Sequence, residues 1–279
     1  MKIGMNLLLW TGFVTEADYP TIAKIKAAGF DGVEIPLFDG TAAHYKTLRA
    51  ELDKQGLACS TVTVMNPETN PISPDASIRA AALERLKWAI DINHTLGSFA
   101  MCGPYHSPLG VFSGAGPTAT EKGHAAEVLR KAADFAAQAK LTLAIEYLNR
   151  FECYFLTTAA DARTLVKAVD HPSFRCMYDT FHAHIEEKSQ AAGVAACKDV
   201  FAHVHISEND RGTPGTGQVR WDEAFRAIRD TGYDGWWDVE LFSDDGTFGD
   251  AYPDSLWALP AEETARLVRE SFDRVWSQL

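Results

Sequence analysis

The sequence has few cysteines and no pair of them in C-x-x-C spacing. The five are Cys59, Cys102, Cys153, Cys176 and Cys197, an odd and scattered set. This pattern argues against a disulfide framework and against a zinc ribbon. Several of them fall in apolar segments, where a reduced, buried thiol is the ordinary expectation. A reducing, cytoplasmic environment is therefore expected.

Long apolar runs and a basic start are also missing. No apolar segment approaches the roughly 18 residues that a membrane-spanning helix needs. The start, MKIGMNLLLW, has a single lysine and lacks the basic region, the long apolar run and the small-residue cleavage site of a signal peptide. We expect a soluble chain with no membrane partner.

Positive charge is scarce. The chain carries 26 Lys and Arg against 38 Asp and Glu, which gives a formal net charge of −12. Proteins that bind a phosphate backbone need clustered cations. Nucleic acid is therefore not expected as a partner, and a small neutral substrate is.

What the sequence does have is a regular alternation of strand-length apolar segments and helix-length amphipathic segments. The expected strands cover residues 2–10, 30–35, 57–64, 98–102, 141–146, 174–179, 200–206 and 235–241. The expected helices cover residues 18–29, 42–55, 76–96, 118–139, 158–169, 188–199, 221–231 and 260–278. Eight such units predict parallel strands joined by right-handed crossovers. The alternative, an open doubly wound sheet, usually has a Gly-rich phosphate loop after its first strand, and none follows Trp10. We predict an α/β fold, a single (β/α)₈ TIM barrel domain over residues 1–279.

Four ionisable residues lie at or near the ends of the last four expected strands: Glu146, Asp179, His205 and Glu240. Side chains at the C-terminal ends of barrel strands converge on the active site. Three converging carboxylates resist ionising together unless a cation neutralises them. Oxygen-rich coordination with one imidazole suits Mn²⁺, Mg²⁺ or Co²⁺ better than structural zinc. The sequence therefore predicts one divalent metal ion.

Several assignments at this rim have alternatives. Any one of the four residues could instead form a local salt bridge or a helix cap, but their shared position favours a metal site. His203 and His205 alternate on one strand face; we choose His205 as the nearer to the strand end and expect His203 one layer deeper, hydrogen-bonded in the core. Glu34 ends another strand and is expected either beside the metal ligands or in an ion pair with a rim arginine.

The second half of the chain carries specific motifs. They read EYLNRFE (146–152), DTFHAHIEE (179–187), HISENDR (205–211), GTG (215–217) and ELF (240–242). This series resembles the ketose 3-epimerases, the D-tagatose/D-allulose/L-ribulose 3-epimerase group of the xylose isomerase-like TIM barrel superfamily. The likeness spans essentially the whole barrel, including GFDGVEI (29–35), which is common across the superfamily.

The resemblance implies roles for the rim residues. As metal ligands it implies Glu146, Asp179, His205 and Glu240, with Mn²⁺ as the favoured ion and Co²⁺ or Mg²⁺ as alternatives. Glu146 and Glu240 would also be the catalytic acid/base pair, and Glu152, His182 and Arg211 would bind the substrate. The implied enzyme is an isomerase, a metal-dependent ketose 3-epimerase that removes and returns a proton through a metal-stabilised cis-enediolate. Such enzymes are expected to act on small sugars and to form homo-oligomers, either dimers or tetramers.

Other functions stay open. An epimerase, isomerase or lyase of 3-keto-glycosides could use the same site, and so could an aldose–ketose isomerase related to hydroxypyruvate isomerase. An endonuclease IV-like repair enzyme would need more histidine ligands than the nine scattered here supply. A non-catalytic sugar-binding subunit would need no acid/base pair.

Departures from the family pattern concern the substrate pocket. Ser207 stands where glycine is common, and His184 where asparagine is usual. Aromatic residues that could stack on a sugar, or simply pack in loops and core, are Trp10, Phe38, Tyr105, Phe112 and Trp257. The identity of the sugar is therefore left open by the sequence.

Overall fold

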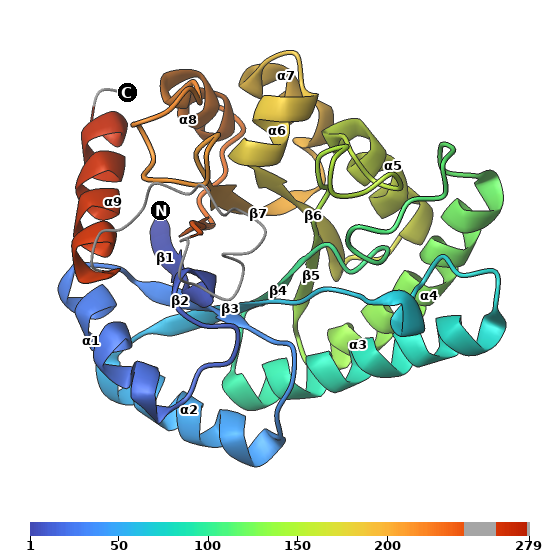
Figure 1. Ribbon diagram of the computed structural model, residues 1–279, viewed down its shortest axis with the longest axis horizontal. Helices are drawn as coiled ribbons and strands as arrows, with labels where there is room; N and C mark the ends of the chain where they lie inside the picture. Colours follow the sequence, from blue (N-terminus) through green and yellow to red (C-terminus); the bar gives the residue numbers. More distant parts are fainter. Residues whose placement is uncertain (243–260, 278–279) are drawn as a thin grey trace.

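The structure, a computed structural model, describes residues 1–242 and 261–277. Eight parallel strands close into a barrel in chain order, because β1 pairs with both β2 and β8 (Figure 1). The strands are β1 (Lys2–Asn6), β2 (Gly32–Pro36), β3 (Ala58–Val62), β4 (Ala100–Gly103), β5 (Thr142–Ile145), β6 (Phe174–Asp179), β7 (Phe201–Ile206) and β8 (Trp236–Val239). The predicted (β/α)₈ barrel is confirmed.

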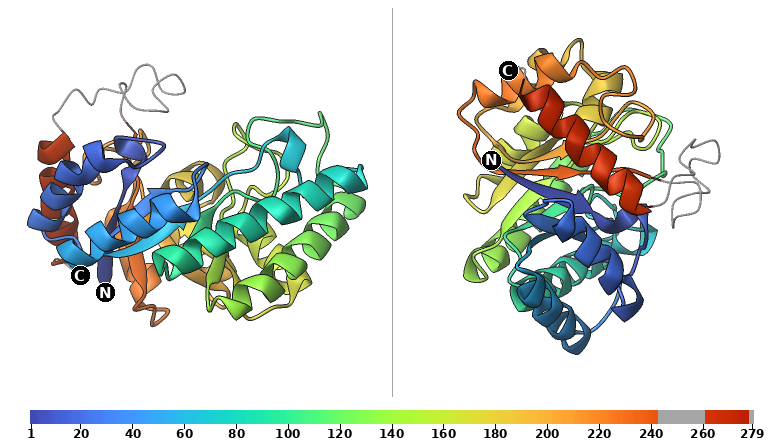
Figure 2. Two further views of the ribbon diagram at one scale, coloured as in Figure 1. Left: turned by 90° about the horizontal axis from the view of Figure 1, so that it is seen from below. Right: turned by 90° about the vertical axis from the view of Figure 1, so that its left-hand side faces the viewer.

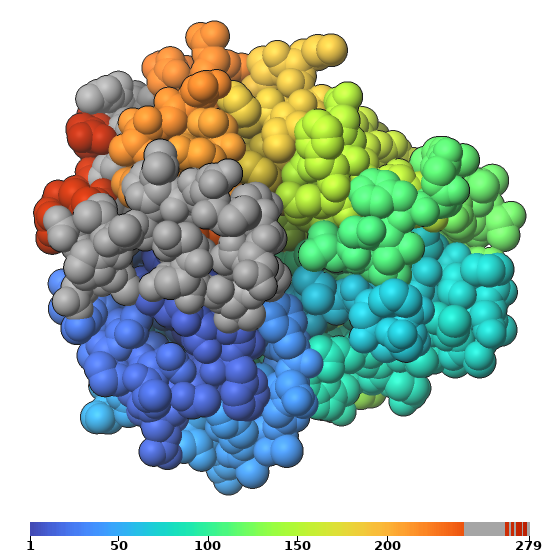
Figure 3. Space-filling view, in the orientation of Figure 1, coloured from blue at the N-terminus to red at the C-terminus, as the bar shows by residue number. Residues whose placement is uncertain are grey.

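Helices surround the barrel on the outside (Figure 2). In the described part of the chain they are α1 (Tyr19–Ala27), α2 (Ala42–Gln55), α3 (Ala76–Leu96), α4 (Ala119–Gln138), α5 (Ala159–Val169), α6 (Thr180–Glu186), α7 (Gln190–Cys197), α8 (Trp221–Arg229) and α9 (Ala261–Trp276). None of these is long and apolar enough to cross a membrane. In the space-filling view, the long helices α3 and α4 lie at the right-hand edge of the molecule (Figure 3).

Two predicted boundaries differ from the structure in ways that shape the site. The first strand was expected over residues 2–10 but ends at Asn6, where Leu7–Leu9 form a 3₁₀ turn. The Asn6 side chain caps this turn by accepting a hydrogen bond of 2.8 Å from the Leu8 amide. The chain therefore leaves the barrel wall earlier than its apolar character suggests.

The second difference is the extra helix α6, which directly follows β6. Only one helix, at 188–199, was expected between the strands at 174–179 and 200–206, yet the chain forms both α6 and α7 there. The carboxylate of Asp179 caps α6 by accepting a 2.6 Å hydrogen bond from the Phe181 amide. The strand thus turns straight into a helix, which carries His182.

The inside of the barrel is partly polar. Asn6, Glu34, Ser60, His203 and Asp238 are all fully buried or nearly so. Strand pairing sets three of them side by side, since Asn6 pairs with Glu34 and Glu34 with Ser60. The Ser60 hydroxyl oxygen lies within hydrogen-bond distance of both carboxylates, 3.2 Å from Oε2 of Glu34 and 2.5 Å from Oδ2 of Asp238. A connected polar group therefore crosses the barrel below its C-terminal rim.

Candidate metal centre and active site

Four strand ends bring Glu146, Asp179, His205 and Glu240 together. Glu146 directly follows β5, Asp179 ends β6, His205 lies near the end of β7 and Glu240 directly follows β8. One nitrogen or oxygen atom from each side chain lies within 4.8 Å of those from the other three, and all four residues are buried. The spacing suits donors that share one ion, since opposite oxygen ligands of a divalent cation lie about 4–5 Å apart.

The His205 ring shows that this group fits a divalent cation. Its Nδ1 lies 3.8 Å from Oδ2 of Asp179 and 3.7 Å from Oε1 of Glu240. Neither ring nitrogen makes a hydrogen bond of standard geometry with the described residues. A fully buried imidazole without such a partner is costly unless another group binds it. Three carboxylates beside one imidazole supply mainly oxygen ligands, as Mn²⁺ and Mg²⁺ prefer.

The carboxylates of this group have divergent acidities. Burial raises the pKa of Glu146 to about 7, although contact with His182 opposes the rise. Burial also acts to raise the pKa of Asp179, but the charges of His182 and Arg211 and the contact with His205 bring it well below its usual range.

His182, on α6, is oriented from both sides. The backbone amide of Asn149 donates a 3.0 Å hydrogen bond to Nδ1, so in the neutral ring the proton is on Nε2. Nε2 lies 3.3 Å from Oε1 of Glu146. The His182 side chain is therefore held against a proposed metal ligand, where it also borders the pocket described below.

Arg211 lies on the other side of the same group. Its Nη1 donates to Oε2 of Glu240 at 2.7 Å and to Oγ of Ser207 at 3.0 Å. The guanidinium stacks on the ring of Phe181, 3.7 Å from the ring centroid, and lies 4.9 Å from that of Phe242. Its backbone has a φ of 60°, a left-handed conformation that costs a side-chain-bearing residue about 1–2 kcal/mol. Such strain needs support from the surrounding loop.

Glu208 supplies that support. Its buried carboxylate accepts four hydrogen bonds from the loop after β7 and the start of α8. The donors are the amides of Asn209 (3.1 Å), Gly215 (2.8 Å) and Val219 (2.8 Å), and the indole Nε1 of Trp221 (2.8 Å). The sequence assigned no role to Glu208; the available signal was a carboxylate just before a Gly-containing loop.

A cavity of about 270 Å³ opens over this group. Its lining residues are Leu8, Phe38, Val62, Val64, Pro104, Leu109, Gly110, Glu146, Leu148, Phe151, Glu152, His182, Arg211, Glu240 and Phe242. The three expected substrate-binding residues, Glu152, His182 and Arg211, all border it. Glu152 is oriented by a 2.7 Å hydrogen bond from the Asn149 side-chain amide.

The aromatic residues that could stack on a sugar lie in different environments. Phe38 lines the cavity, while Tyr105 is buried in the core and Trp10 packs against it. Phe112 is exposed and does not border the cavity. Trp257 lies outside the described residues.

Two further sequence expectations concern Glu34 and His203. Glu34 contacts the two histidines of β7 rather than a rim arginine: its Oε1 lies 2.8 Å from Nε2 of His205. His203 is buried one layer deeper, as expected, with Nε2 3.1 Å from Oδ2 of Asp238. Nε2 of His203 also lies 3.5 Å from Oε2 of Glu34, so the ring is held between two buried carboxylates.

Comparison with known proteins identifies the class to which this barrel belongs. The chain belongs to the xylose isomerase-like TIM barrel family, whose model matches residues 22–272. Within that family it belongs with the ketose 3-epimerases. It is 32% identical to a ketose 3-epimerase of Arthrobacter globiformis over 244 residues, which cover 87% of this chain and 84% of the relative.

Other similar proteins are also named as 3-epimerases. A D-psicose 3-epimerase of Agrobacterium fabrum is 30% identical over 239 residues, 84% of this chain and 83% of that protein. A crystal structure of D-psicose 3-epimerase with D-tagatose from Clostridium cellulolyticum superimposes with a TM-score of 0.91 at 27% identity and covers 99% of both chains. The resemblance inferred from the second-half motifs is confirmed.

Proposed function

We propose that this protein is a metal-dependent ketose 3-epimerase, an isomerase that inverts the configuration at carbon 3 of a ketose. The observation that carries the proposal is the meeting of Glu146 and Glu240 in one buried group with Asp179 and His205. The ketose 3-epimerase and D-psicose 3-epimerases to which the chain is similar support the choice of reaction.

In this proposal Glu146, Asp179, His205 and Glu240 bind one divalent ion, Mn²⁺ first and Co²⁺ or Mg²⁺ as alternatives. When bound, such an ion would act as a Lewis acid toward the ketone oxygen and the neighbouring hydroxyl. Two of the proposed ligands, Glu146 and Glu240, line the cavity, so a ketose would enter with its carbonyl end toward them.

The two glutamates would move the proton. Inversion of a carbon requires a base on one face and an acid on the other. Glu146 follows β5 and Glu240 follows β8, so they approach the reacting carbon from different sides of the barrel. One removes the proton from carbon 3 and the other returns a proton to the opposite face.

Three residues would hold the sugar. His182 and Arg211 lie against the two glutamates at 3.3 and 2.7 Å, so both can donate to hydroxyl groups at the reacting end. Glu152 borders the same cavity and would accept from a hydroxyl near the carbonyl end.

We further propose a cytoplasmic homo-oligomer, a dimer or tetramer, that acts on small sugars. Five buried, unpaired cysteines support a reducing compartment. The formal charge of −12 favours a neutral sugar over nucleic acid as the partner.

The test is proton exchange observed by NMR. The metal-loaded protein is incubated in D₂O with D-fructose, D-tagatose, D-psicose and L-ribulose, each with an EDTA-treated control. We expect metal-dependent formation of the 3-epimer with deuterium at carbon 3. An aldose product with deuterium at carbon 2 would indicate an aldose–ketose isomerase instead. Failure on all four sugars with metal bound would move the substrate to 3-keto-glycosides.

A further inference from the structure

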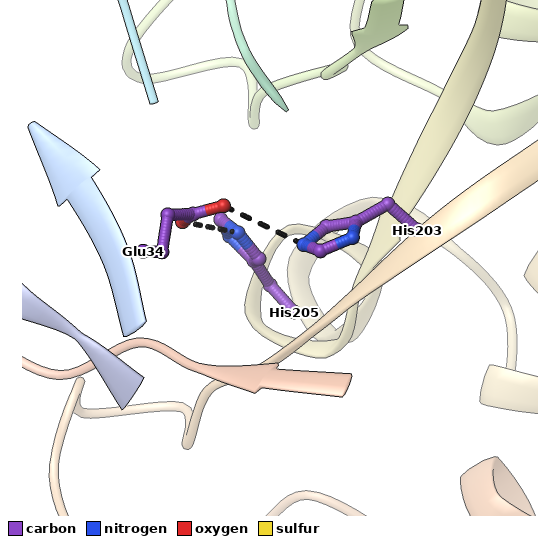
Figure 4. A group of neighbouring side chains, drawn as sticks. All are labelled: Glu34, His203 and His205. Carbon is purple, nitrogen blue, oxygen red and sulfur yellow. Dashed lines mark ion pairs between the residues drawn. The ribbon is translucent and has the colours of Figure 1, made fainter. Parts of the chain in front are cut away.

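A second buried group lies directly beneath the proposed metal ligands. It joins Glu34 of β2 to His203 and His205 of β7, and Figure 4 shows the Glu34 carboxylate facing both rings. Oε1 of Glu34 lies 2.8 Å from Nε2 of His205, and Oε2 lies 3.5 Å from Nε2 of His203. All three side chains are fully buried. Glu34 therefore contacts the ring nitrogen of His205 that points away from the other proposed ligands.

Asn6 links this group to the opposite side of the metal centre. Its Nδ2 donates to Oε1 of Glu34 at 2.8 Å and to Oε1 of Glu240 at 3.2 Å. Its Oδ1 accepts from the Leu8 amide, which fixes the orientation of the side-chain amide. Asn6 can bridge the two glutamates because β1 lies between β2 and β8 in the barrel. One asparagine thus ties Glu34 to a proposed catalytic residue.

We infer that Glu34 and Asn6 are positioning residues of the metal centre, Glu34 acting through His205 and Asn6 acting through Glu240. An imidazole that binds a metal through Nδ1 carries its proton on Nε2, and a carboxylate near that nitrogen fixes the tautomer and strengthens the ligand. This inference rests on the metal site of the proposed function. It adds that the site depends on two residues that touch neither metal nor sugar.

Asp238 provides a matched control for the loss of a buried charge. It is as buried as Glu34 and belongs to the same polar group, with Oδ2 3.1 Å from Nε2 of His203 and a hydrogen bond from Ser60. Among the described residues its side chain makes no hydrogen bond or ion pair with the four proposed ligands, although Asp238 lies beside His205 in the register of β7 and β8. Asp238→Asn therefore removes the same charge, one step further from the ion.

Binding of Mn²⁺ alone, measured by calorimetry on the full chain, tests the inference. Glu34→Gln should weaken binding about 10–100-fold, the usual cost of losing a carboxylate behind a ligating histidine. Asp238→Asn should stay within about threefold of the wild type, because its loss reaches the ion only through other side chains. Excess Mn²⁺ should restore much of the turnover of Glu34→Gln but none of that of Glu240→Gln.

Other outcomes separate this inference from the proposed function. Wild-type affinity in Glu34→Gln, or an equal loss in Asp238→Asn, overturns the positioning role while the metal site stands. A wild-type protein that binds no Mn²⁺, Co²⁺ or Mg²⁺ removes the metal site itself, and the inference with it. If Glu34→Gln does not fold, the variants Glu34→Asp and Asn6→Ala test the inference in its place. Each should weaken binding while circular dichroism stays native, and unchanged affinity in both refutes the inference.

Discussion

The two halves of the barrel contribute different chemistry to one cavity. Every ionisable residue among its described lining residues follows one of the strands β5 to β8. The first half supplies Leu8, Phe38, Val62, Val64, Pro104, Leu109 and Gly110, none of which carries a charge. One side of the cavity can therefore bind a cation and move protons, while the other excludes water and restricts shape. The ionisable lining residues therefore come from the second half, and the first half adds an apolar wall.

This division has a physical reason. Electrostatic interactions between charged groups and a substrate are stronger when water is excluded, and an apolar wall opposite the charged groups excludes it. The cost is that an apolar wall cannot hydrogen-bond the far hydroxyl groups of a sugar, so it selects by fit. The predictions below test each side of this division.

The largest effect is expected from Glu240→Gln in the second half. The amide keeps the size of the side chain but cannot accept a proton, so kcat should fall by about 10²–10⁴-fold. Native circular dichroism and a thermal midpoint near that of the wild type should show that the chain still folds. Glu84→Gln, an exposed change on α3, is the control and should leave kcat unchanged. Wild-type turnover in Glu240→Gln would remove this residue from the acid/base pair.

A smaller loss is expected from Glu208→Gln, which stays in the second half but touches no substrate. A glutamine amide would point N–H groups at backbone donors, and each buried unpaired donor costs about 1–3 kcal/mol. The loop after β7 should become more mobile, and Arg211 should leave its strained conformation. Because Arg211 is proposed to bind the sugar, KM should rise about tenfold or more while kcat changes less.

Steady-state kinetics on the preferred ketose measure this effect. Glu223→Gln is the matched control, since within residues 1–242 and 261–277 its carboxylate accepts only one backbone hydrogen bond from outside its own helix, that of the Ala191 amide. Equal KM values in the wild type and Glu208→Gln would mean that the loop holds Arg211 without this carboxylate.

The sequence predicted the second half of the site better than the first, for a structural reason. The positions of Glu146, Asp179 and Glu240 follow from one rule, that functional side chains lie at the ends of barrel strands. Asn6 gave no such signal, because its partners are 28 and 234 residues away and only barrel closure brings them near. Helix α6 was not predicted, because it begins directly after β6 with no loop between them, and Asp179 both ends the strand and caps the helix.

The two halves of the barrel also shift the pKa values of buried histidines in opposite directions. In the first half, burial lowers the pKa of His106 from 6.5 to about 3. In the second half, the pKa of His182 is raised, because the charge of Asp179 and the contact with Glu146 outweigh its burial. His106 thus stays neutral in the folded chain, and it contacts Ser107 at 2.8 Å.

This difference predicts a pH effect on stability. Below its unfolded pKa of 6.5, His106 binds a proton only in the unfolded chain. Above pH 6.5 the neutral His106 ring therefore costs the folded chain no stability. As the pH falls from 6.5 toward 3, the unfolding free energy decreases by about 1.4 kcal/mol per pH unit. Histidines with raised pKa values act in the opposite sense, so the comparison must be with His106→Gln. Between about pH 7 and pH 5, the wild type should lose about 2 kcal/mol more unfolding free energy than this variant. Urea titrations measure it, and parallel losses would contradict the prediction.

The smallest effect is expected from Val64→Thr in the apolar wall. Threonine keeps the shape of valine and adds one hydroxyl that faces the cavity, so it can change fit and solvation but not proton transfer. Values of kcat/KM for the four ketoses should each move by less than about tenfold, and their ranking should shift, because a hydroxyl added to an apolar pocket discriminates weakly. Mn²⁺ affinity should not change. Val111→Thr, an exposed position outside the cavity, is the control. A loss in Val64→Thr as large as that of Glu240→Gln would show that the first half takes part in the chemistry, and the division between the two halves would fail.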